Sequence, residues 1–349
     1  MVSDALAGFL AQLTVITNAE IAWLATGNRS LMNSNWQSGR RPWLARNRMA
    51  LISAAAIAAY GIFVEWVWGW LALLRQWAEI GLTPILSALA LLVATYFIRC
   101  YRIQDYFPGE TGGRFLTLFR VTQVHNLLNI MLPFRAGETS FPLLMRSEFG
   151  VPLMRGTSAL LVMRLLDLHA LLMVAAIGLV IDRDYRAIDW LLWLLAFLAP
   201  LAFFLLKEPA VAMMRRLAPE KFRSLVDEVE AGLPDGISAF LRAWTMTVLN
   251  WAVKVAVLAW VLAIMGVAPI AASFGGALGG ELSSVLPVHA PAGVGTYAAA
   301  IVAGAVSFGA TADHATLELL GRASVNAHLL VIVSAVAGTF LSLVLKPKT

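Results

Sequence analysis

The stretch LPFRAGE (residues 132–138) interrupts an apolar segment, with LLNIM before it and SFPLLM after it. It combines a proline and a glycine with Arg135 and Glu138, so it suits neither a continuous helix nor a lipid-exposed backbone. Lipid offers no partner to free N–H and C=O groups. If this stretch lies at membrane depth, it must therefore be buried in protein or line a wet cavity.

The composition around this stretch is that of a polytopic helical membrane protein. Hydrophobic residues make up 60% of the chain and charged residues 13%, and the mean hydropathy is +0.76. A soluble domain carries about 25% charged residues. The single cysteine, Cys100, excludes an intrachain disulfide and a cysteine-based metal cluster. The net charge of +5 fits cytoplasmic loops that face anionic lipid, so we expect no nucleic-acid partner. We also expect no cofactor.

Six apolar segments approach the roughly 20 residues that a membrane-spanning helix needs. Residues 5–25 form a weaker apolar stretch within an N-terminal extension (1–48). This stretch is predicted to be either an extra span or an interfacial helix. The six predicted spans are 49–74, 80–98, 157–181, 190–206, 243–266 and 322–345.

Charged loops set the predicted orientation by the positive-inside rule. The 26–48 loop and the 207–242 connection are rich in Lys and Arg, so we place them in the cytoplasm. The 182–189 and 311–321 loops carry acidic residues, so we place them outside.

Two further apolar regions, 115–146 and 270–310, are each broken by proline and glycine. The predicted topology requires each to enter and leave on one side, the first from the cytoplasm and the second from outside. We therefore predict two oppositely oriented re-entrant helical hairpins in an all-α membrane protein.

The two halves of the chain, 49–181 and 190–345, then repeat the same order of elements in opposite orientations. LPFRAG (132–137) recurs as LPVHAPAG (286–293), and DLHALLMV (167–174) recurs as NAHLLVIV (326–333). We predict an inverted-topology repeat, an arrangement that many secondary transporters share.

Ionisable residues inside predicted spans are costly and usually face the interior of the bundle. Arg164 and Asp167 lie three residues apart on one helix face, where an ion pair of purely structural role is the alternative to a ligand site. Lys254 lies near the middle of a span and needs an acid or a phosphate. Glu281 is its candidate partner, and a buried bridge without a ligand is the alternative.

The two hairpin turns supply the remaining candidates. Arg135 could bind a lipid phosphate together with nearby helix N-termini, while Glu138 holds it in place or responds to a cationic head group. A self-paired turn is the alternative. In the second turn, His289, Pro291, Gly293 and Gly295 offer a ring nitrogen and a glycine-rich backbone, although simple loop flexibility explains such a turn equally well. The other histidines show no metal-ligand spacing.

Four motifs resemble the transmembrane region of bacterial lysyl-phosphatidylglycerol synthases: NIMLPFRAGE (129–138), RSEFGVP (146–152), MRLLDL (163–168) and LPVHAPAGVGTY (286–297). The resemblance covers most of 49–345 and implies movement of a lipid between leaflets. Other relatives are associated with hopanoid or polyprenyl-glycolipid pathways. By motif position, the resemblance implies functional roles for Asn129, Pro133, Arg135, Gly137, Glu138, Arg164, Asp167, Pro287, Gly293 and Gly295.

This chain departs from that family at Ala298, where the family often has a glutamate. A mechanism that needs a carboxylate at this position is therefore in doubt. The sequence also contains no soluble aminoacyl-transfer domain, so the synthase reaction is not expected of it.

These observations favour a bacterial inner-membrane flippase or transporter for a phospholipid or glycolipid. Its partner would be an anionic phospholipid or a lipid-linked glycan, with cations at membrane depth compensating the phosphate and the carboxylates organising those cations or coupling proton movement. Homo-oligomerisation is left open. The alternatives are an intramembrane enzyme, which no HExxH, GxSxG or paired-aspartate motif supports, and a scaffold subunit of lipid head-group, hopanoid or glycolipid biosynthesis.

Overall fold

The computed structural model of the chain is all-helical in the residues that it describes, with no strand among them. The predicted N-terminal extension lies outside these residues, except for Arg48. The described residues are 48–132, 137–181, 187–217, 219–220, 223–285 and 290–345.

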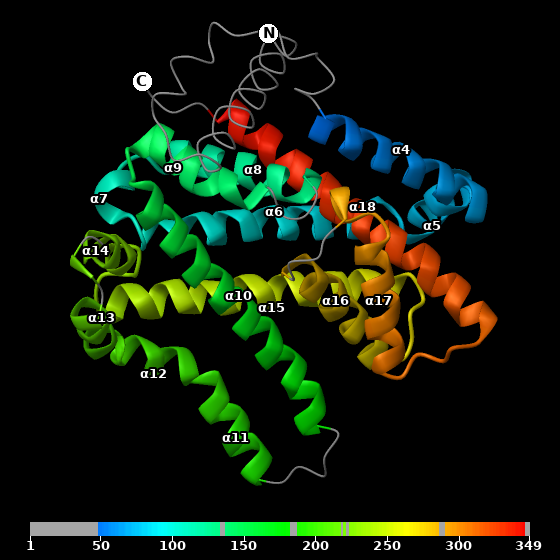
Figure 1. Cartoon of the computed structure of the whole chain (residues 1–349). Coiled ribbons are helices and arrows are strands. Elements are labelled where there is room, and N and C mark those ends of the chain that lie inside the picture. The colour runs from blue at the N-terminus through cyan, green and yellow to red at the C-terminus, as the bar shows by residue number, and fades with distance from the viewer. Residues whose placement is uncertain are drawn as a thin grey trace, which may run out of the picture.

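The helices follow the order that Figure 1 shows. Those of the first half are α4 (Arg48–Val67), α5 (Trp70–Ile80), α6 (Leu82–Gln104), α7 (Pro108–Thr111), α8 (Phe115–Met131), α9 (Ser140–Phe149) and α10 (Leu153–Ile181). Those of the second half are α11 (Ala187–Phe197), α12 (Ala199–Leu205), α13 (Lys207–Leu217), α14 (Arg223–Ala231), α15 (Gly236–Ile264), α16 (Ile270–Val285), the short 3₁₀ helix η3 (Pro291–Gly293), α17 (Thr296–Ser307) and α18 (His314–Val344).

Four of the described helices are long and apolar enough to cross a membrane: α6, α10 over Leu153–Ile177, α15 and α18. Helices α11 and α12 are bent by 40° relative to each other and could together make a fifth span where 190–206 was predicted. Pro200 in the first turn of α12 fits this break, because a proline is tolerated at a helix start but not in a helix interior. The chain is therefore a multi-pass membrane protein with four or five spans in its described part.

The prediction of one continuous span over 49–74 is wrong. Helix α4 ends at Val67, and Gly69 has a φ of 75°, a conformation that residues with a side chain rarely adopt. Trp70 stabilises this break, since its backbone N–H donates to a Glu65 carboxylate oxygen (2.7 Å) and its indole N–H donates to the Gly61 carbonyl (3.1 Å). The apolar run is thus divided between two helices.

Helix breaks occur at both stretches that the sequence singled out. Helix α8 ends one residue before LPFRAGE, and α9 begins at Ser140 and packs beside α8. Helix α16 ends at Val285 and packs along α17, which begins at Thr296 (Figure 1).

Glycines allow α16 and α17 to pack at backbone contact. A Cβ placed on Gly279 would lie 2.2 Å from the carbonyl oxygen of Ala300. A Cβ on Gly304 would lie 2.1 Å from the carbonyl oxygen of Gly275. Small residues at such spacing let helices approach closely in membranes, so these two helices form one tightly packed unit.

The helix contacts show a regular pattern. Helices α6 and α15 pack against each other at the centre. Helix α10 packs against α9, α15 and α16, and α18 packs against α17, α6 and α8. These two sets of contacts correspond when α6 is exchanged with α15, α8–α9 with α16–α17, and α10 with α18. Helix α10 also packs against α11 and α14, outside this correspondence.

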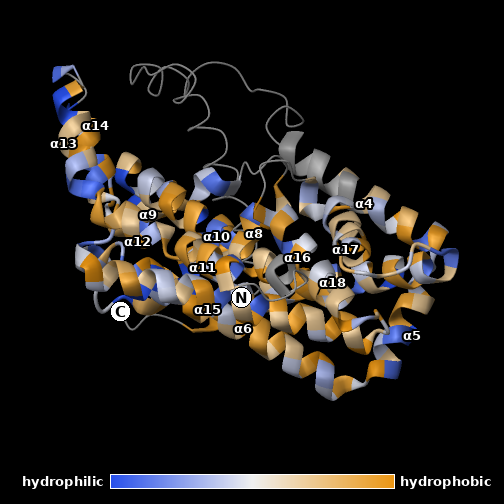
Figure 2. Cartoon of the chain, turned by 90° about the horizontal axis from the view of Figure 1, so that it is seen from below, coloured by the Kyte–Doolittle hydropathy of each residue, from blue (hydrophilic) through white to orange (hydrophobic). Residues whose placement is uncertain are grey.

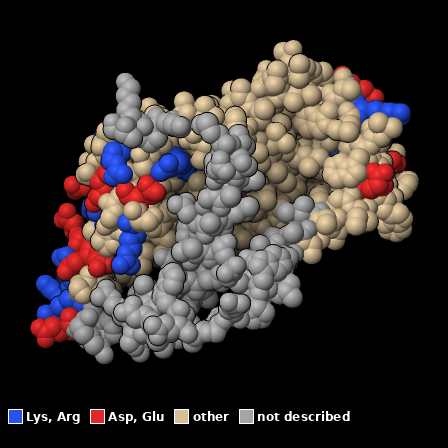
Figure 3. Space-filling view, turned by 90° about the horizontal axis from the view of Figure 1, so that it is seen from above, with Lys and Arg blue, Asp and Glu red and all other residues tan. Residues whose placement is uncertain are grey.

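Charged side chains gather at the two ends of the molecule, and apolar surface covers much of the rest (Figures 2 and 3). One end, around α7, α13 and α14, carries the ion pairs Arg155–Glu110, Arg215–Asp227 and Arg242–Asp105. The large apolar side chains exposed between the ends, such as Leu165 and Phe340, suit contact with lipid.

At the opposite end, Asp313 caps helix α18. Its carboxylate accepts the backbone N–H of Thr316 at 3.0 Å and the hydroxyl groups of Thr311 and Thr316. These hydrogen bonds hold the pKa of the Asp313 carboxyl well below its usual range, because they favour the ionised form.

Candidate functional site

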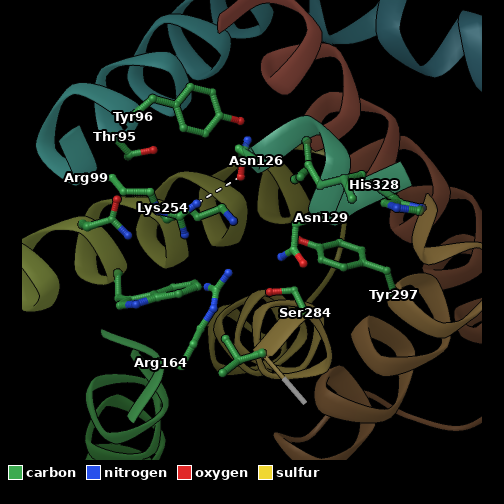
Figure 4. A pocket seen from close by; sticks show the side chains of 15 residues that line it. Thr95, Tyr96, Arg99, Asn126, Asn129, Arg164, Lys254, Ser284, Tyr297 and His328 are labelled. Carbon is green, nitrogen blue, oxygen red and sulfur yellow. Dashed lines mark hydrogen bonds between the residues drawn. The ribbon is translucent and has the colours of Figure 1, made fainter. Parts of the chain in front are cut away.

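A cavity lies beside the last turns of α8 and α16 (Figure 4). Its lining comes from α6, α8, α10, α15, α16, α17 and α18, so both halves of the chain contribute. The volume that the centre of a water molecule can occupy inside it is about 60 Å³. At roughly 10–15 Å³ for each water on that measure, it has room for a few waters.

The two central helices present similar side chains to this cavity at identical spacing. Each supplies a small polar residue, then an aromatic residue, then a cation three positions later. The residues are Thr95, Tyr96 and Arg99 from α6, and Asn250, Trp251 and Lys254 from α15.

Helix α8 adds two asparagines beside Arg99. The Arg99 guanidinium donates to Asn126 Oδ1 at 3.0 Å (Figure 4). Nδ2 of Asn126 and Oδ1 of Asn129 are buried and have no hydrogen-bond partner among the described residues. Unpaired buried polar groups are costly, so this corner of the cavity suits water or a polar ligand.

Asp167 lies behind the cavity wall with its side chain fully buried. It accepts hydrogen bonds from Arg102, from the Trp251 indole N–H (2.9 Å) and from Arg164 (3.4 Å). The predicted contact between Arg164 and Asp167 is therefore present. Arg164 also pairs with Glu138 at 2.8 Å, so it connects the segment just before α9 to the cavity.

Glu281 is the second fully buried carboxylate. Lys254 Nζ lies 2.7 Å from its Oε2, and the Tyr297 hydroxyl donates to its Oε1 at 2.6 Å. The predicted pairing of Lys254 with Glu281 is therefore present. Lys254 nevertheless also lines the cavity, whereas Glu281 does not.

The predicted turn residues are partly described. Pro133, Arg135, Pro287 and His289 lie outside the described residues. Gly137 packs so closely on α8 that a Cβ there would lie 2.4 Å from the Leu128 carbonyl oxygen, which explains the glycine.

The second turn leads into α17 through Pro291 and Gly293 of η3 and through Gly295, the residue before the helix. Gly293 and Gly295 have φ values of 67° and 73°, which favour glycine. Ala298 follows on α17 and belongs to an apolar cluster with Val64. A carboxylate at position 298 would have apolar neighbours there.

Arg99 and Arg102 are site residues that the sequence predictions missed. The span predicted over 80–98 stops before both, whereas α6 continues to Gln104 because Arg102 is buried against Asp167 and Thr247. The repeated spacing of the cavity residues on α6 and α15 was a signal that could have identified Arg99.

The histidines of the bundle have local partners. His125 Nδ1 lies 2.9 Å from the Ser140 hydroxyl, and His328 stacks on Tyr297 with ring centroids 4.7 Å apart. Within the described ranges, no group of three His, Cys, Asp or Glu side chains could hold a metal ion.

Comparison with known proteins gives one family and no individual relative. The model of the family described as "Lysylphosphatidylglycerol synthase TM region" matches residues 50–336, which is most of the chain. No curated protein and no solved structure matches. This multi-pass chain, with its cation-lined central cavity, therefore belongs to the lysylphosphatidylglycerol synthase transmembrane-region family.

Proposed function

We propose that this protein moves an anionic lipid between the leaflets of the bacterial inner membrane. The head group would pass through the central cavity while the acyl chains stay in the bilayer. The observation that carries the proposal is the lining of the cavity, which contains Arg99, Arg164 and Lys254 and, among the described residues, no carboxylate. Arg164 and Lys254 already pair with carboxylates, whereas Arg99 has no carboxylate within 4 Å among the described residues. A cation at membrane depth needs a counter-charge, and a lipid phosphate would supply it for Arg99.

The depth of the cavity supports this reading. Lys254 lies ten residues before the end of α15 at Ile264, which is about 15 Å at 1.5 Å per residue. The hydrocarbon core is about 30 Å thick, so Lys254 would lie near the middle of the membrane. A head group bound there would be about equally far from both leaflets.

The arrangement of the helix pairs supports a transport cycle. The last turns of α8 and α16 both reach the cavity, through Asn129 and Ser284 respectively. Helix α8 follows α7 at one charged end, and α17 leads toward Asp313 at the other (Figure 1). Two re-entrant hairpins from opposite sides would produce this arrangement.

The exchange of contacts between the two halves supports an inverted repeat. Helices α10 and α18 have corresponding neighbours, and α6 and α15 correspond to each other at the centre. Inverted repeats permit alternating access, because each half can adopt the conformation of the other.

The volume of the cavity implies that transport needs movement. Space for a few waters is too small for a glycerophosphate head group. The hairpins must therefore separate to admit the lipid, and the close contact at Gly279 and Gly304 favours displacement of α16 and α17 as one unit.

The test is a translocation assay on the full chain reconstituted in vesicles. Fluorescent phosphatidylglycerol is distributed over both leaflets, and dithionite reduces only the label that reaches the outer leaflet. We expect wild-type protein to make the inner label accessible, and Asn129→Leu to slow this by filling the polar corner of the cavity. Arg242→Ala, at an exposed ion pair, is the matched control and should leave the rate unchanged.

Mass spectrometry of the same vesicles separates the rival functions. Conversion of the lipid without translocation would support an intramembrane enzyme and overturn the proposal. Neither movement nor conversion by well-folded protein would also overturn it and favour a scaffold subunit.

A further inference from the structure

We infer that Arg99 selects the charge of the ligand: the cavity binds a phosphodiester head group with one net negative charge between Arg99 and Lys254, and it disfavours a head group that carries an ammonium. This inference rests on the proposed function and specifies its substrate class.

Among the residues that the structure describes, the charges around the cavity do not balance. The described cations at the site are Arg99, Arg102, Arg164 and Lys254, and the carboxylates that contact them are Glu138, Asp167 and Glu281. One positive charge is left over. Among the described residues, no carboxylate lies within 4 Å of Arg99, whereas each of the other three cations has one. A ligand with one negative charge would neutralise these described groups.

The hydrogen-bonding groups beside Arg99 suit an oxyanion. Arg99 already donates a hydrogen bond to Oδ1 of Asn126, which leaves Nδ2 of that amide as a donor. Asn126 is only 9% exposed, it lines the cavity, and this Nδ2 atom has no partner among the described residues. A guanidinium and an amide N–H side by side can share the two free oxygens of a phosphodiester.

Lys254 completes the site from the opposite helix. It occupies on α15 the position that Arg99 occupies on α6, and these helices pack against each other (Figure 4). Glu281 neutralises Lys254, so this lysine adds a donor without adding net charge. The corresponding positions of the two cations would allow the phosphate to keep its partners when the halves exchange conformations.

An ammonium group would find no free counter-charge among the described residues that line the cavity. The three carboxylates nearby are already paired with cations, and none of them lines the cavity. A zwitterionic head group would therefore place its ammonium among cations, and like charges at short range in a poorly solvated site repel strongly.

Binding to the purified full chain in detergent tests the ligand class. Calorimetric titration compares dihexanoyl phosphatidylglycerol, dihexanoyl phosphatidylethanolamine, glycerol phosphate and inorganic phosphate. We expect phosphatidylglycerol to bind more tightly than phosphatidylethanolamine, and Arg99→Ala to weaken phosphatidylglycerol by about 10- to 100-fold, the usual effect of losing a charged hydrogen bond. If the soluble phosphates bind as tightly as phosphatidylglycerol, the site takes free anions and the lipid assignment is overturned.

Translocation in vesicles separates a selective role of Arg99 from a structural one. The readout is the ratio of the rates for labelled phosphatidylglycerol and phosphatidylethanolamine. Arg99→Ala should lower this ratio, because it removes the excess charge, and Arg99→Lys should keep the preference at a lower rate because lysine lacks the planar fork. Arg242→Ala should change neither the rates nor the ratio.

The outcomes distinguish the two proposals. If wild-type protein moves both lipids equally, or if Arg99→Ala lowers both rates by the same factor, the selectivity inference fails and the transport function stands. If wild-type protein moves neither lipid, the proposed function itself fails. No carboxylate lies within 4 Å of Arg99 among the described residues, so its removal leaves no carboxylate without a cation. The variant should therefore fold, and size-exclusion chromatography checks this.

Discussion

Replacing Asp167 by alanine should destabilise the protein more than any change to a surface ion pair. The Asp167 carboxylate is fully buried and accepts hydrogen bonds from Arg102, Arg164 and Trp251. Arg102 is itself only 4% exposed, so the variant leaves a buried guanidinium without its counter-charge. Breaking a buried pair in this way costs about 3–5 kcal/mol.

The double variant Arg102→Met/Asp167→Leu provides the internal control. It removes both charges and replaces them with apolar groups of similar size, which is often neutral in stability. We expect it to recover most of the stability that Asp167→Ala loses. Asp105→Ala breaks an exposed pair with Arg242 and should cost less than about 1 kcal/mol.

Unfolding by SDS in mixed micelles, followed by far-ultraviolet circular dichroism, measures these differences. Helicity is the better signal because Trp251 contacts Asp167 and its fluorescence would respond to the substitution directly. A free energy of unfolding for Asp167→Ala within about 1 kcal/mol of wild type would refute the reasoning. So would a double variant that is less stable than the single one.

Gly279→Ala should destabilise the protein by about 1–3 kcal/mol through overpacking against α17, whereas Gly109→Ala, which meets nothing within 4 Å, should not; equal effects in the same SDS titration would contradict the close packing. Tyr297→Phe should cost about 1.5–3 kcal/mol because Glu281 loses a donor to its charge, and an unchanged midpoint would show that this hydrogen bond contributes nothing. The lowered pKa of Asp313 stabilises the fold above the unfolded pKa of about 3.9, and this stabilisation is lost as the pH falls through the folded pKa. The stability difference between wild type and Asp313→Asn should therefore shrink below about pH 4, and a difference independent of pH would contradict it.

Hydropathy and helix-breaking residues predicted much of the fold. The long spans α6, α10, α15 and α18 lie where apolar length indicated them, and helix breaks occur at LPFRAGE and at LPVHAPAG. The wrong prediction of one continuous span over 49–74 has a local cause. Both helices there are apolar, so hydropathy alone does not detect the helix break at Gly69 that Trp70 and Glu65 stabilise.

Sequence spacing predicted contacts within a helix better than contacts between helices. The i, i+3 spacing of Arg164 and Asp167 predicted their ion pair. Glu281 was predicted as the partner of Lys254 because a charge in the middle of the membrane needs a counter-charge. Arg102 was missed because its partner is 65 positions away on another helix, a relation that no local pattern encodes.

Helix α6 shows the physical reason for that miss. An arginine near the end of an apolar run indicates the start of a loop, since a charge in lipid is costly. Burial against Asp167 and Thr247 removes that cost, so the helix continues past Arg102 to Gln104.

The central claim is that the protein moves an anionic lipid through the cavity between the two halves. The most direct measurement is the fraction of labelled phosphatidylglycerol that dithionite reduces in vesicles containing the full chain, compared with empty vesicles. We expect nearly all of the label to become accessible with wild-type protein and Asn129→Leu to delay this. Reduction limited to the outer leaflet, with folded protein in every vesicle, would contradict it.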